Sequence, residues 1–377
     1  MWSLKVEQVT RLQIELTDYC NAHCPMCDRE QKYINKWSLN KHLISFDKYR
    51  SILQNDKWSS LYRIHFCGNY DEPTTHPDIY DICKWTLENF KVSLIIATNG
   101  GTRNRQFWND LGSLSKQHKG RLQVTWGIDG LKDTNHIYRK GVKWDKLEEN
   151  FKAYNGAGGR SRWQFIVFDH NHHQLEHIKK SYRQMGFSSL KLIETYRKTD
   201  TESTVIPVSI KEDNKTSEPI KKVTHDQKDN KISKQIKKDV EDKSIMTHVK
   251  CKALYSESTI GRSLYISSNG NVTPCCWMGT KRSIQDTRES FKKSPHLTKL
   301  KLRKSVHKKT DLDRIMNDDN NINNYEKMSD VLGSGYFELL KTTIADKTSK
   351  TCNENCTIKI GQHDDKDFSV SGRAYYQ

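Results

Sequence analysis

The sequence predicts an α/β fold with a small second unit at its C-terminal end, and three observations predict it. Six apolar, strand-like runs alternate with five amphipathic helical segments over the first 195 residues. Such alternation implies parallel strands joined by right-handed crossovers. Asn269-Gly270 lies inside the run 263–276, which is a strong β-hairpin signal. The length of 377 residues suits one large domain plus a smaller one.

Each element of the α/β part has its own signal. Ser45 can cap a helix whose apolar residues share one face, and the strand runs end in polar residues and glycine. The expected strands are 11–17, 61–67, 92–97, 122–128, 163–168 and 190–193, and the expected helices are 46–54, 77–88, 104–118, 144–154 and 173–185. Polar residues at the carboxyl ends of such strands are where a β/α barrel places its ligand contacts.

The chain divides into three parts by composition. Residues 1–197 form the predicted α/β core. Residues 198–250 are rich in Lys, Asp, Glu, Thr and Ser with isolated apolar residues, which indicates a charged linker or insertion without a packed core. Residues 251–377 contain the hairpin signal and a second group of cysteines, so we expect a small α+β domain there.

Three cysteines, Cys20, Cys24 and Cys27, follow the first predicted strand with the spacing C-x3-C-x2-C. Three thiolates on one short loop can converge on one inorganic centre, and soft sulfur ligands suit iron–sulfur clusters. A [4Fe–4S] cubane has four irons, so three cysteines leave one iron open for a small ligand. The alternatives are a zinc knuckle and three unrelated thiols. Zinc wants four protein ligands and usually paired C-x2-C spacing, so we favour the cluster.

The loop resembles the signature of the radical S-adenosylmethionine (SAM) superfamily. The resemblance implies a partial (β/α)6 TIM-like barrel of the radical SAM type. It also implies that the amino and carboxylate groups of SAM chelate the open iron. SAM is then cleaved to a 5′-deoxyadenosyl radical that abstracts hydrogen from a substrate. Met26, directly before the third cysteine, stands at the position that lies beside the adenine in the family.

Two further stretches are similar to cofactor contacts of that family. Asp71-Glu72-Pro73 matches the end of the Gly-Gly-Glu-Pro-like segment that holds the SAM amino group, with Asp71 where glycine is usual. Thr98 and Asn99 end the third predicted strand, in the region that borders the SAM ribose. Asn99-Gly100 is also an ordinary turn signal.

The segment Gly127–Gly130, followed by His136, Tyr138 and Arg139, resembles the Ser-Ile-Asp-Gly…His…Tyr-Arg pattern of peptide- and protein-modifying radical SAM enzymes. Gly127 replaces the serine, so that side-chain contact does not carry over. Arg139 is retained, and a guanidinium can bind the SAM carboxylate bidentately. A surface ion pair is the alternative for Arg139, and both remain open here.

The second cysteine group resembles the auxiliary-cluster extensions called SPASM and twitch domains. The resemblance implies a second, auxiliary [4Fe–4S] cluster that suits electron transfer, because four thiolates would leave no open iron. Its ligands would be Cys251, Cys275, Cys352 and Cys356, with Cys276 able to replace Cys275. A structural zinc site with four cysteine ligands is the alternative.

Ten cysteines in short-spaced groups, without a signal peptide or an apolar run near 18 residues, favour metal binding in a cytoplasmic, reducing setting with no membrane partner. We interpret Cys67 and Cys83 as packed thiols. The net charge is +17, and residues 281–310 carry eleven Lys and Arg against two acids. We favour a solvated helix face for this segment over a patch for an acidic partner, such as nucleic acid, an acidic peptide or a reductant such as flavodoxin or ferredoxin.

The resemblance implies a radical SAM oxidoreductase that oxidatively modifies a peptide, a protein side chain or a small alcohol, with the auxiliary cluster as electron acceptor. Two alternatives from other classes remain. One is a zinc-binding, nucleic-acid-binding module without catalysis, and the other is a degenerate protein that binds SAM without turnover. No general base stands out in the sequence.

Overall fold

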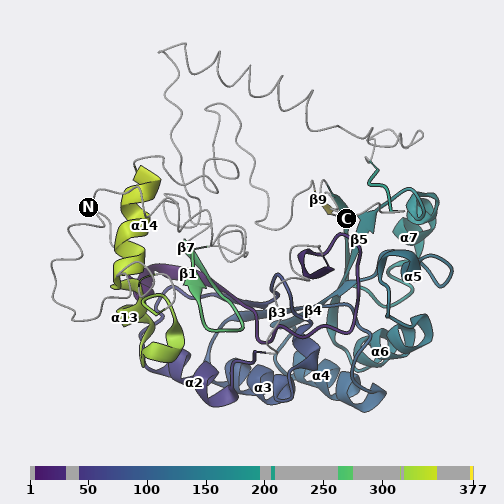
Figure 1. Ribbon diagram of the computed structural model, residues 1–377. Helices are drawn as coiled ribbons and strands as arrows, with labels where there is room; N and C mark the ends of the chain where they lie inside the picture. Colours follow the sequence, from purple (N-terminus) through teal and green to yellow (C-terminus); the bar gives the residue numbers. More distant parts are fainter. Residues whose placement is uncertain are drawn as a thin grey trace, which may run out of the picture.

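The structure is a computed structural model that describes residues 5–30, 42–195, 205–208, 262–274, 315, 318–345 and 374–376. Its centre is one nine-stranded sheet in the order β8-β7-β1-β2-β3-β4-β5-β6-β9. Strands β1 to β6 and β7 run parallel, while β8 and β9 add antiparallel edges. The sheet curves as an open, partial barrel with helices along its outer side (Figure 1).

The six predicted strands are all present in sequence order, with helices between them as predicted. The strands are β1 (Val9–Ile14), β2 (Arg63–Phe66), β3 (Ser93–Thr98), β4 (Leu122–Gly127), β5 (Arg160–Val167) and β6 (Ser189–Glu194). The helices are α2 (Phe46–Gln54), α3 (Ile79–Asn89), α4 (Arg105–Gln117), α5 (Asn135–Tyr138), α6 (Trp144–Gly156) and α7 (Leu175–Ser181). The short helix α5 was not predicted, and α7 is shorter than the predicted 173–185. The α/β part of the prediction is therefore confirmed.

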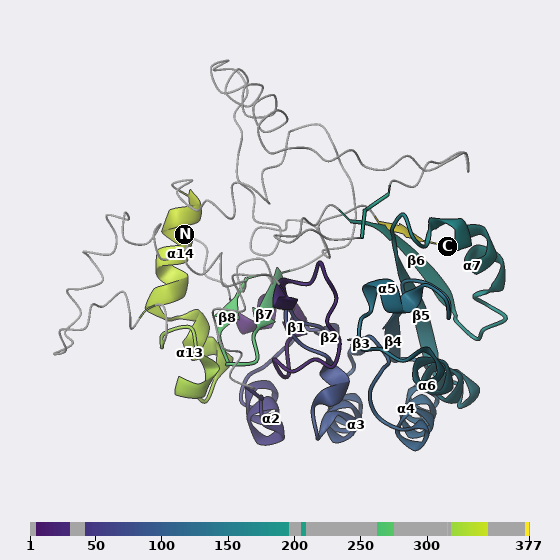
Figure 2. The ribbon, with the colours of Figure 1, turned by 45° about the vertical axis from the view of Figure 1, so that its right-hand side comes forward.

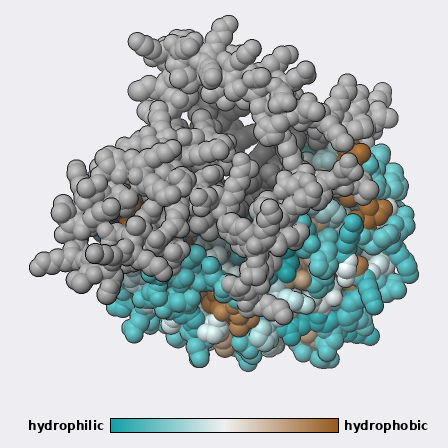
Figure 3. Space-filling model, in the orientation of Figure 1, coloured by the Kyte–Doolittle hydropathy of each residue, from teal (hydrophilic) through white to brown (hydrophobic). Residues whose placement is uncertain are grey.

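Local chemistry explains where the helices begin. The Ser45 side chain accepts a hydrogen bond from the Lys48 backbone N–H, and the Asn104 side chain accepts one from Phe107, so both α2 and α4 have N-caps. The helices turn a polar side outward, and the described surface over α3, α4 and α6 is largely hydrophilic (Figure 3). Their apolar sides pack on the sheet.

The core lies between the sheet and these helices. All six residues of β4 are buried, which marks it as a central strand. Trp126 of β4 packs on Trp108 of α4 with ring centroids 4.5 Å apart, and Tyr154 of α6 completes the aromatic cluster at 5.9 Å from Trp126. Cys83 of α3 is fully buried, as expected of a packed thiol, whereas Cys67 is half-buried just beyond the end of β2.

The predicted hairpin is present as β7 (Arg262–Ile266) and β8 (Val272–Thr273), but in an unexpected place. Strand β7 pairs in parallel with β1, so the hairpin extends the core sheet (Figure 2). The loop is also longer than the two-residue Asn-Gly turn that we expected. Ile266 pairs with Val272, which leaves five residues in the loop, and Gly270 has φ +92°, a conformation that favours glycine.

Two further segments pack on this core. Residues 205–208 lie within the predicted linker, where Val205 and Val208 are buried and Asp169 donates a backbone hydrogen bond to Ile206. Helices α13 (Met328–Leu332) and α14 (Gly335–Ala345) follow the short 3-10 turn η5 (Ile322–Asn324). Among the described residues, none of the helices is both long and apolar enough to cross a membrane.

Candidate functional site

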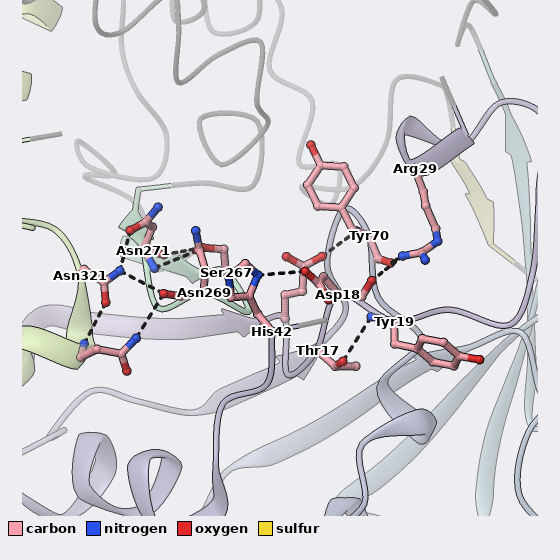
Figure 4. A network of polar contacts seen from close by, with 12 residues as sticks. Thr17, Asp18, Tyr19, Arg29, His42, Tyr70, Ser267, Asn269, Asn271 and Asn321 are labelled. Carbon is pink, nitrogen blue, oxygen red and sulfur yellow. Dashed lines mark hydrogen bonds and ion pairs between the residues drawn. The ribbon is translucent and has the colours of Figure 1, made fainter. Parts of the chain in front are cut away.

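The three cysteines of the predicted signature lie on the loop that leaves the carboxyl end of β1. Neighbouring segments hold this loop on both sides. Glu72 donates its backbone N–H to the Tyr19 carbonyl at 2.8 Å, and His23 donates its own to the Lys140 carbonyl at 2.8 Å. Arg29 donates to the backbone carbonyls of Asp18 and Tyr70 (Figure 4). The loop is therefore fixed to the segments that follow both β2 and β4.

The three thiols are free and lie close to one another. Cys24 is buried at 6% exposure, and Cys20 and Cys27 are half-buried. Burial raises the pKa of Cys20 above its usual range, and charge on Glu72, Cys24 or Cys27 would raise it further. Burial also raises the pKa of Cys24 to about 11, although the Arg139 guanidinium lowers it. Without metal the two thiols stay protonated at neutral pH, and a bound metal displaces those protons.

Hydrogen-bond donors point at the sulfurs of Cys20 and Cys24. Cys20 Sγ accepts from the Ala22 backbone N–H at 3.4 Å and from Asn99 Nδ2 at 3.7 Å. Cys24 Sγ accepts from Arg139 Nη1 at 3.8 Å. Thiols are weak acceptors, whereas the thiolates that hold an iron–sulfur cluster carry negative charge and attract such donors. The surroundings therefore fit cluster-bound thiolates.

Glu72 links the cysteine loop to the end of β3. Its side chain is 2% exposed, and its Oε1 accepts from Thr98 Oγ1 at 2.7 Å and from Thr74 Oγ1 at 2.6 Å. Its Oε2 accepts the Asn99 backbone N–H at 2.6 Å. Asn99 in turn reaches Cys20 with its side chain. Three of the predicted cofactor-binding residues, Glu72, Thr98 and Asn99, are therefore in one place beside the first cysteine.

The loop before Glu72 explains how Asp71 can stand where glycine is usual. Among the described non-glycine residues only Arg103 and Lys119 have positive φ, so the backbone at Asp71 requires no glycine. Asp71 Oδ1 accepts the Gly68 N–H at 2.6 Å, and its Oδ2 is buried without a hydrogen-bond partner in the described structure. At Gly68 itself a Cβ would lie 2.2 Å from Glu15 Oε1, so this position is restricted to glycine.

Glu15 is a site residue that the sequence did not reveal. It is fully buried just beyond β1, where it accepts from the Tyr70 backbone N–H at 2.6 Å and from the Tyr265 hydroxyl at 2.9 Å. Burial raises the pKa of Glu15 to about 7, and it raises the pKa of Asp71 and Glu72 as well. Among the described residues none of these three carboxylates forms an ion pair with a Lys, Arg or His. A buried acidic group without a cation favours a positively charged ligand.

Arg139 lies on the other side of the cysteines. Its Nε donates to Asp129 Oδ2 at 2.6 Å, and the side chains are 17% and 0% exposed. Arg139 therefore forms an ion pair, but the pair is buried and does not lie at the surface as the alternative from the sequence expected. Burial opposes the charge of Arg139, but Asp129 raises its pKa above the usual range. At Gly127 a Cβ would lie 2.6 Å from Arg139 Nη2, so glycine leaves room for the guanidinium.

Met26 is 4% exposed and belongs to the hydrophobic core cluster. Its position beside an adenine ring stays a prediction. Four cysteines, the proposed ligands of the auxiliary site, lie outside the described residues, as does the basic segment 281–310. They are Cys251, Cys275, Cys352 and Cys356, and Cys276 also lies outside.

Comparisons with known proteins were made by sequence and by structure. No protein-family model matches the chain. A curated relative is the tungsten-containing aldehyde ferredoxin oxidoreductase cofactor-modifying protein of Pyrococcus furiosus, 23% identical over 188 residues. That match covers 48% of this chain and 49% of the relative, so the chain aligns with about half the length of that protein.

The solved structures that match the chain include the following three. Streptococcus suis SuiB bound to S-adenosylmethionine has a TM-score of 0.47 at 15% identity, over 82% of this chain and 66% of SuiB. Native anSMEcpe with bound AdoMet has a TM-score of 0.42 at 13% identity, over 90% and 100% of the two chains. BtrN in complex with AdoMet and 2-DOIA has a TM-score of 0.39 at 12% identity, over 96% and 95%.

The chain is thus similar to proteins whose structures were solved with S-adenosylmethionine or AdoMet bound. The assignment of individual residues to SAM or to a cluster stays a prediction, although the structure brings the predicted residues of the radical SAM core to one end of the sheet.

One more residue lies in the loop that follows β5. His170 follows β5, its side chain is 11% exposed, and its ring stacks on Phe168 at an interplanar angle of 13°. Its Nδ1 lies 3.6 Å from Asp169 Oδ1, too far for a hydrogen bond. His172, by contrast, contacts the Asp169 carbonyl with its Nδ1 at 2.6 Å. Sequence gave no means to separate these neighbouring histidines, since they share one polar loop.

Proposed function

We propose that this chain is a radical SAM enzyme. The Cys20, Cys24 and Cys27 thiolates would hold a [4Fe–4S] cluster with one open iron, and SAM would bind beside it. When bound, the cluster and SAM together supply a 5′-deoxyadenosyl radical that abstracts a hydrogen atom from substrate. The observation that carries the proposal is the convergence of N–H donors on the sulfurs of Cys20 and Cys24.

The charge distribution around the loop supports SAM as the ligand. SAM carries a sulfonium and an ammonium group, both cationic, and a carboxylate. The buried Glu15 and Glu72 and the half-buried Asp71 supply carboxyl groups without an ion-pair partner among the described residues. Glu72 is oriented by Thr98 and by the Asn99 backbone, so it can receive a cation without further rearrangement.

We further propose that the reaction is an oxidative modification of a peptide, a protein side chain or a small alcohol, with an auxiliary [4Fe–4S] cluster as electron acceptor. The similarity of 127–139 to peptide- and protein-modifying enzymes favours a peptide. SuiB has been solved bound to the precursor peptide SuiA, and anSMEcpe with a peptide, whereas BtrN has been solved with 2-DOIA. A reductant such as flavodoxin or ferredoxin would supply the electron.

The first test is release of 5′-deoxyadenosine from SAM. Protein purified and reconstituted without oxygen, then mixed with dithionite and SAM, should release it, and the Cys24→Ala variant should not. Cys67→Ala is the matched control, because Cys67 is a half-buried cysteine outside the signature. If wild-type protein with a full cluster releases none, the chain binds SAM without turnover. If it contains zinc and no sulfide, the zinc alternative is correct.

A further inference from the structure

We propose that Arg139 raises the reduction potential of the cluster at the cysteine loop by directing a charged N–H donor at the Cys24 sulfur. This inference rests on the proposed function, because it needs the cluster to be present. It gives Arg139 a role toward the cluster that is separate from any contact with SAM. Arg139 is then a positioning residue that acts through a metal ligand.

The contact itself is part of a buried chain of three groups. Arg139 Nη1 donates to Cys24 Sγ at 3.8 Å, and Arg139 Nε donates to Asp129 Oδ2 at 2.6 Å. Cys24 is 6% exposed and Asp129 is 0% exposed, so bulk water screens this arrangement little. The cation therefore acts on the sulfur through a low-dielectric path.

Asp129 keeps the guanidinium in place because its own position is fixed from three directions. Its Oδ1 accepts the Ile166 backbone N–H at 2.6 Å, and its backbone N–H donates to Asn135 Oδ1 at 3.0 Å. Its carbonyl accepts from Asn171 Nδ2 at 2.9 Å. These bonds join β5 and α5 to the end of β4. Arg139 thus cannot turn away from Cys24 without breaking a buried ion pair.

Gly127 belongs to the same arrangement. A Cβ at this position would lie 2.6 Å from Arg139 Nη2 and 3.1 Å from its Cζ, closer than side-chain atoms normally approach. The resemblance expects serine here, and the departure to glycine lets the guanidinium pack flat against the backbone of β4. Glycine at position 127 lacks the side chain of the predicted SAM contact, and its small size leaves room for the Arg139 guanidinium that contacts Cys24.

The direction of the effect follows from charge. Reduction adds one negative charge to an iron–sulfur cluster, and part of that charge resides on its thiolate ligands. A nearby guanidinium and a hydrogen bond to sulfur stabilise the reduced form, which raises the potential. The donors at Cys20 come from neutral groups, Ala22 and Asn99. The donor at Cys24 is instead a charged guanidinium.

The test is an EPR-monitored redox titration of anaerobically reconstituted protein without SAM, so that any Arg139 contact with SAM plays no part. The relevant signal is the one that disappears in Cys24→Ala. In Arg139→Gln we expect the ratio of reduced to oxidised cluster at a fixed potential to fall about tenfold, which equals about 59 mV for one electron. Arg139→Lys keeps a positive charge without the planar guanidinium, so its cluster should have a reduction potential between those of wild type and Arg139→Gln.

Arg139→Gln leaves Asp129 buried without its partner and can fail to fold. The double variant Asp129→Asn/Arg139→Gln removes both charges and tests the same contact. Arg121→Gln is the matched control, because Arg121 stands at the opposite end of β4 and donates to the Phe90 and Leu87 carbonyls. We expect the reduction potential of the cluster in Arg121→Gln to equal that of the wild-type protein.

The outcomes separate the two proposals. A wild-type protein that assembles no iron–sulfur cluster rejects the proposed function. A wild-type cluster whose potential is unchanged in Arg139→Gln, or in the double variant if the single one does not fold, rejects only the role of Arg139. A lowered potential in these variants, with Arg121→Gln unaffected, supports it.

Discussion

The two sides of the cysteine loop differ in how their buried acids are compensated. On the β4 side, Asp129 has a cation of its own, since Arg139 pairs with it at 2.6 Å. On the β1–β2 side, Glu15 and Glu72 are buried and Asp71 is half-buried with a buried Oδ2, yet none has an ion-pair partner among the described residues. These carboxyl groups accept hydrogen bonds from neutral groups instead, such as the Tyr70 backbone N–H at Glu15 and the Thr98 hydroxyl at Glu72.

This difference shows on which side of the cysteine loop the protein itself balances the charge of its buried acids before a ligand binds. The Asp129–Arg139 pair is electrically neutral and serves a fixed purpose, to hold a donor at Cys24. The β1–β2 acids must instead keep protons or receive a cation, because two neighbouring buried carboxylates cannot both be charged at low cost. We therefore expect ligand- and pH-dependent behaviour on that side only.

The largest expected effect is the loss of stability when the Asp129–Arg139 ion pair is broken. Arg139→Gln leaves Asp129 buried and uncompensated, so the free energy of unfolding should fall by about 3–5 kcal/mol. Urea denaturation of the metal-free protein measures it. Adding Asp129→Asn to this variant should restore much of the loss. An Arg139→Gln protein as stable as wild type would show that the pair is solvated and would remove the contrast between the two sides.

The next effect concerns Glu15, whose pKa burial raises from 4.5 to about 7. Folded protein keeps a proton on Glu15 over this range that unfolded protein has released, so stability should fall as pH rises from 4.5 to 7. The slope is about 1.4 kcal/mol per pH unit at most. Glu15→Gln should remove this contribution and be more stable than wild type at pH 8. The exposed Glu7→Gln should follow wild type, and a Glu15→Gln profile parallel to wild type would contradict the account.

A smaller effect is expected on ligand binding. Asp71→Asn keeps the oxygen that accepts from Gly68 but removes the negative charge. SAM affinity should fall about tenfold, as for loss of one hydrogen bond to a charged group. Affinity for 5′-methylthioadenosine, which lacks both cationic groups, should not change. Isothermal titration calorimetry compares the two ligands, and an equal loss for both would show that Asp71 acts on the loop and not on the cation.

The smallest expected effect tests the link between the hairpin and the unpaired acids. Tyr265→Phe removes the hydroxyl that donates to Glu15 Oε2 at 2.9 Å and should lower the free energy of unfolding by about 1 kcal/mol. Tyr62→Phe is the control, because Tyr62 is an exposed tyrosine that accepts from Arg11 Nε at 2.5 Å. Equal effects of the two variants would show that β7 adds nothing specific to the site.

Local patterns were sufficient to predict the core. The helix that begins after Ser45 was predicted as 46–54, the bounds that α2 has, because its cap and its apolar face both lie within ten residues. Thr98 and Asn99 could be singled out from sequence because they follow the apolar run of the third predicted strand, and their role toward SAM stays a prediction. The structure brings Glu72, Thr98 and Asn99 together with Cys20, as parallel strands require.

Contacts between distant segments could not be predicted. Strand β7 pairs with β1 across about 250 residues, and nothing in the periodicity of either strand indicates its partner. Glu15 was missed for the same reason, because its role depends on Tyr70 and on Tyr265 of that distant strand. Gly127 was interpreted as a lost contact, and only the position of Arg139 shows why glycine suits it.

The central claim is that Cys20, Cys24 and Cys27 hold a four-iron cluster, and iron and acid-labile sulfide analysis tests it most directly. Wild-type protein reconstituted without oxygen should contain about four more irons and four more sulfides per chain than the variant with all three cysteines replaced by alanine, as the cubane formula requires. Equal iron and sulfide contents in the two proteins, or zinc in place of iron at this loop, would contradict the account.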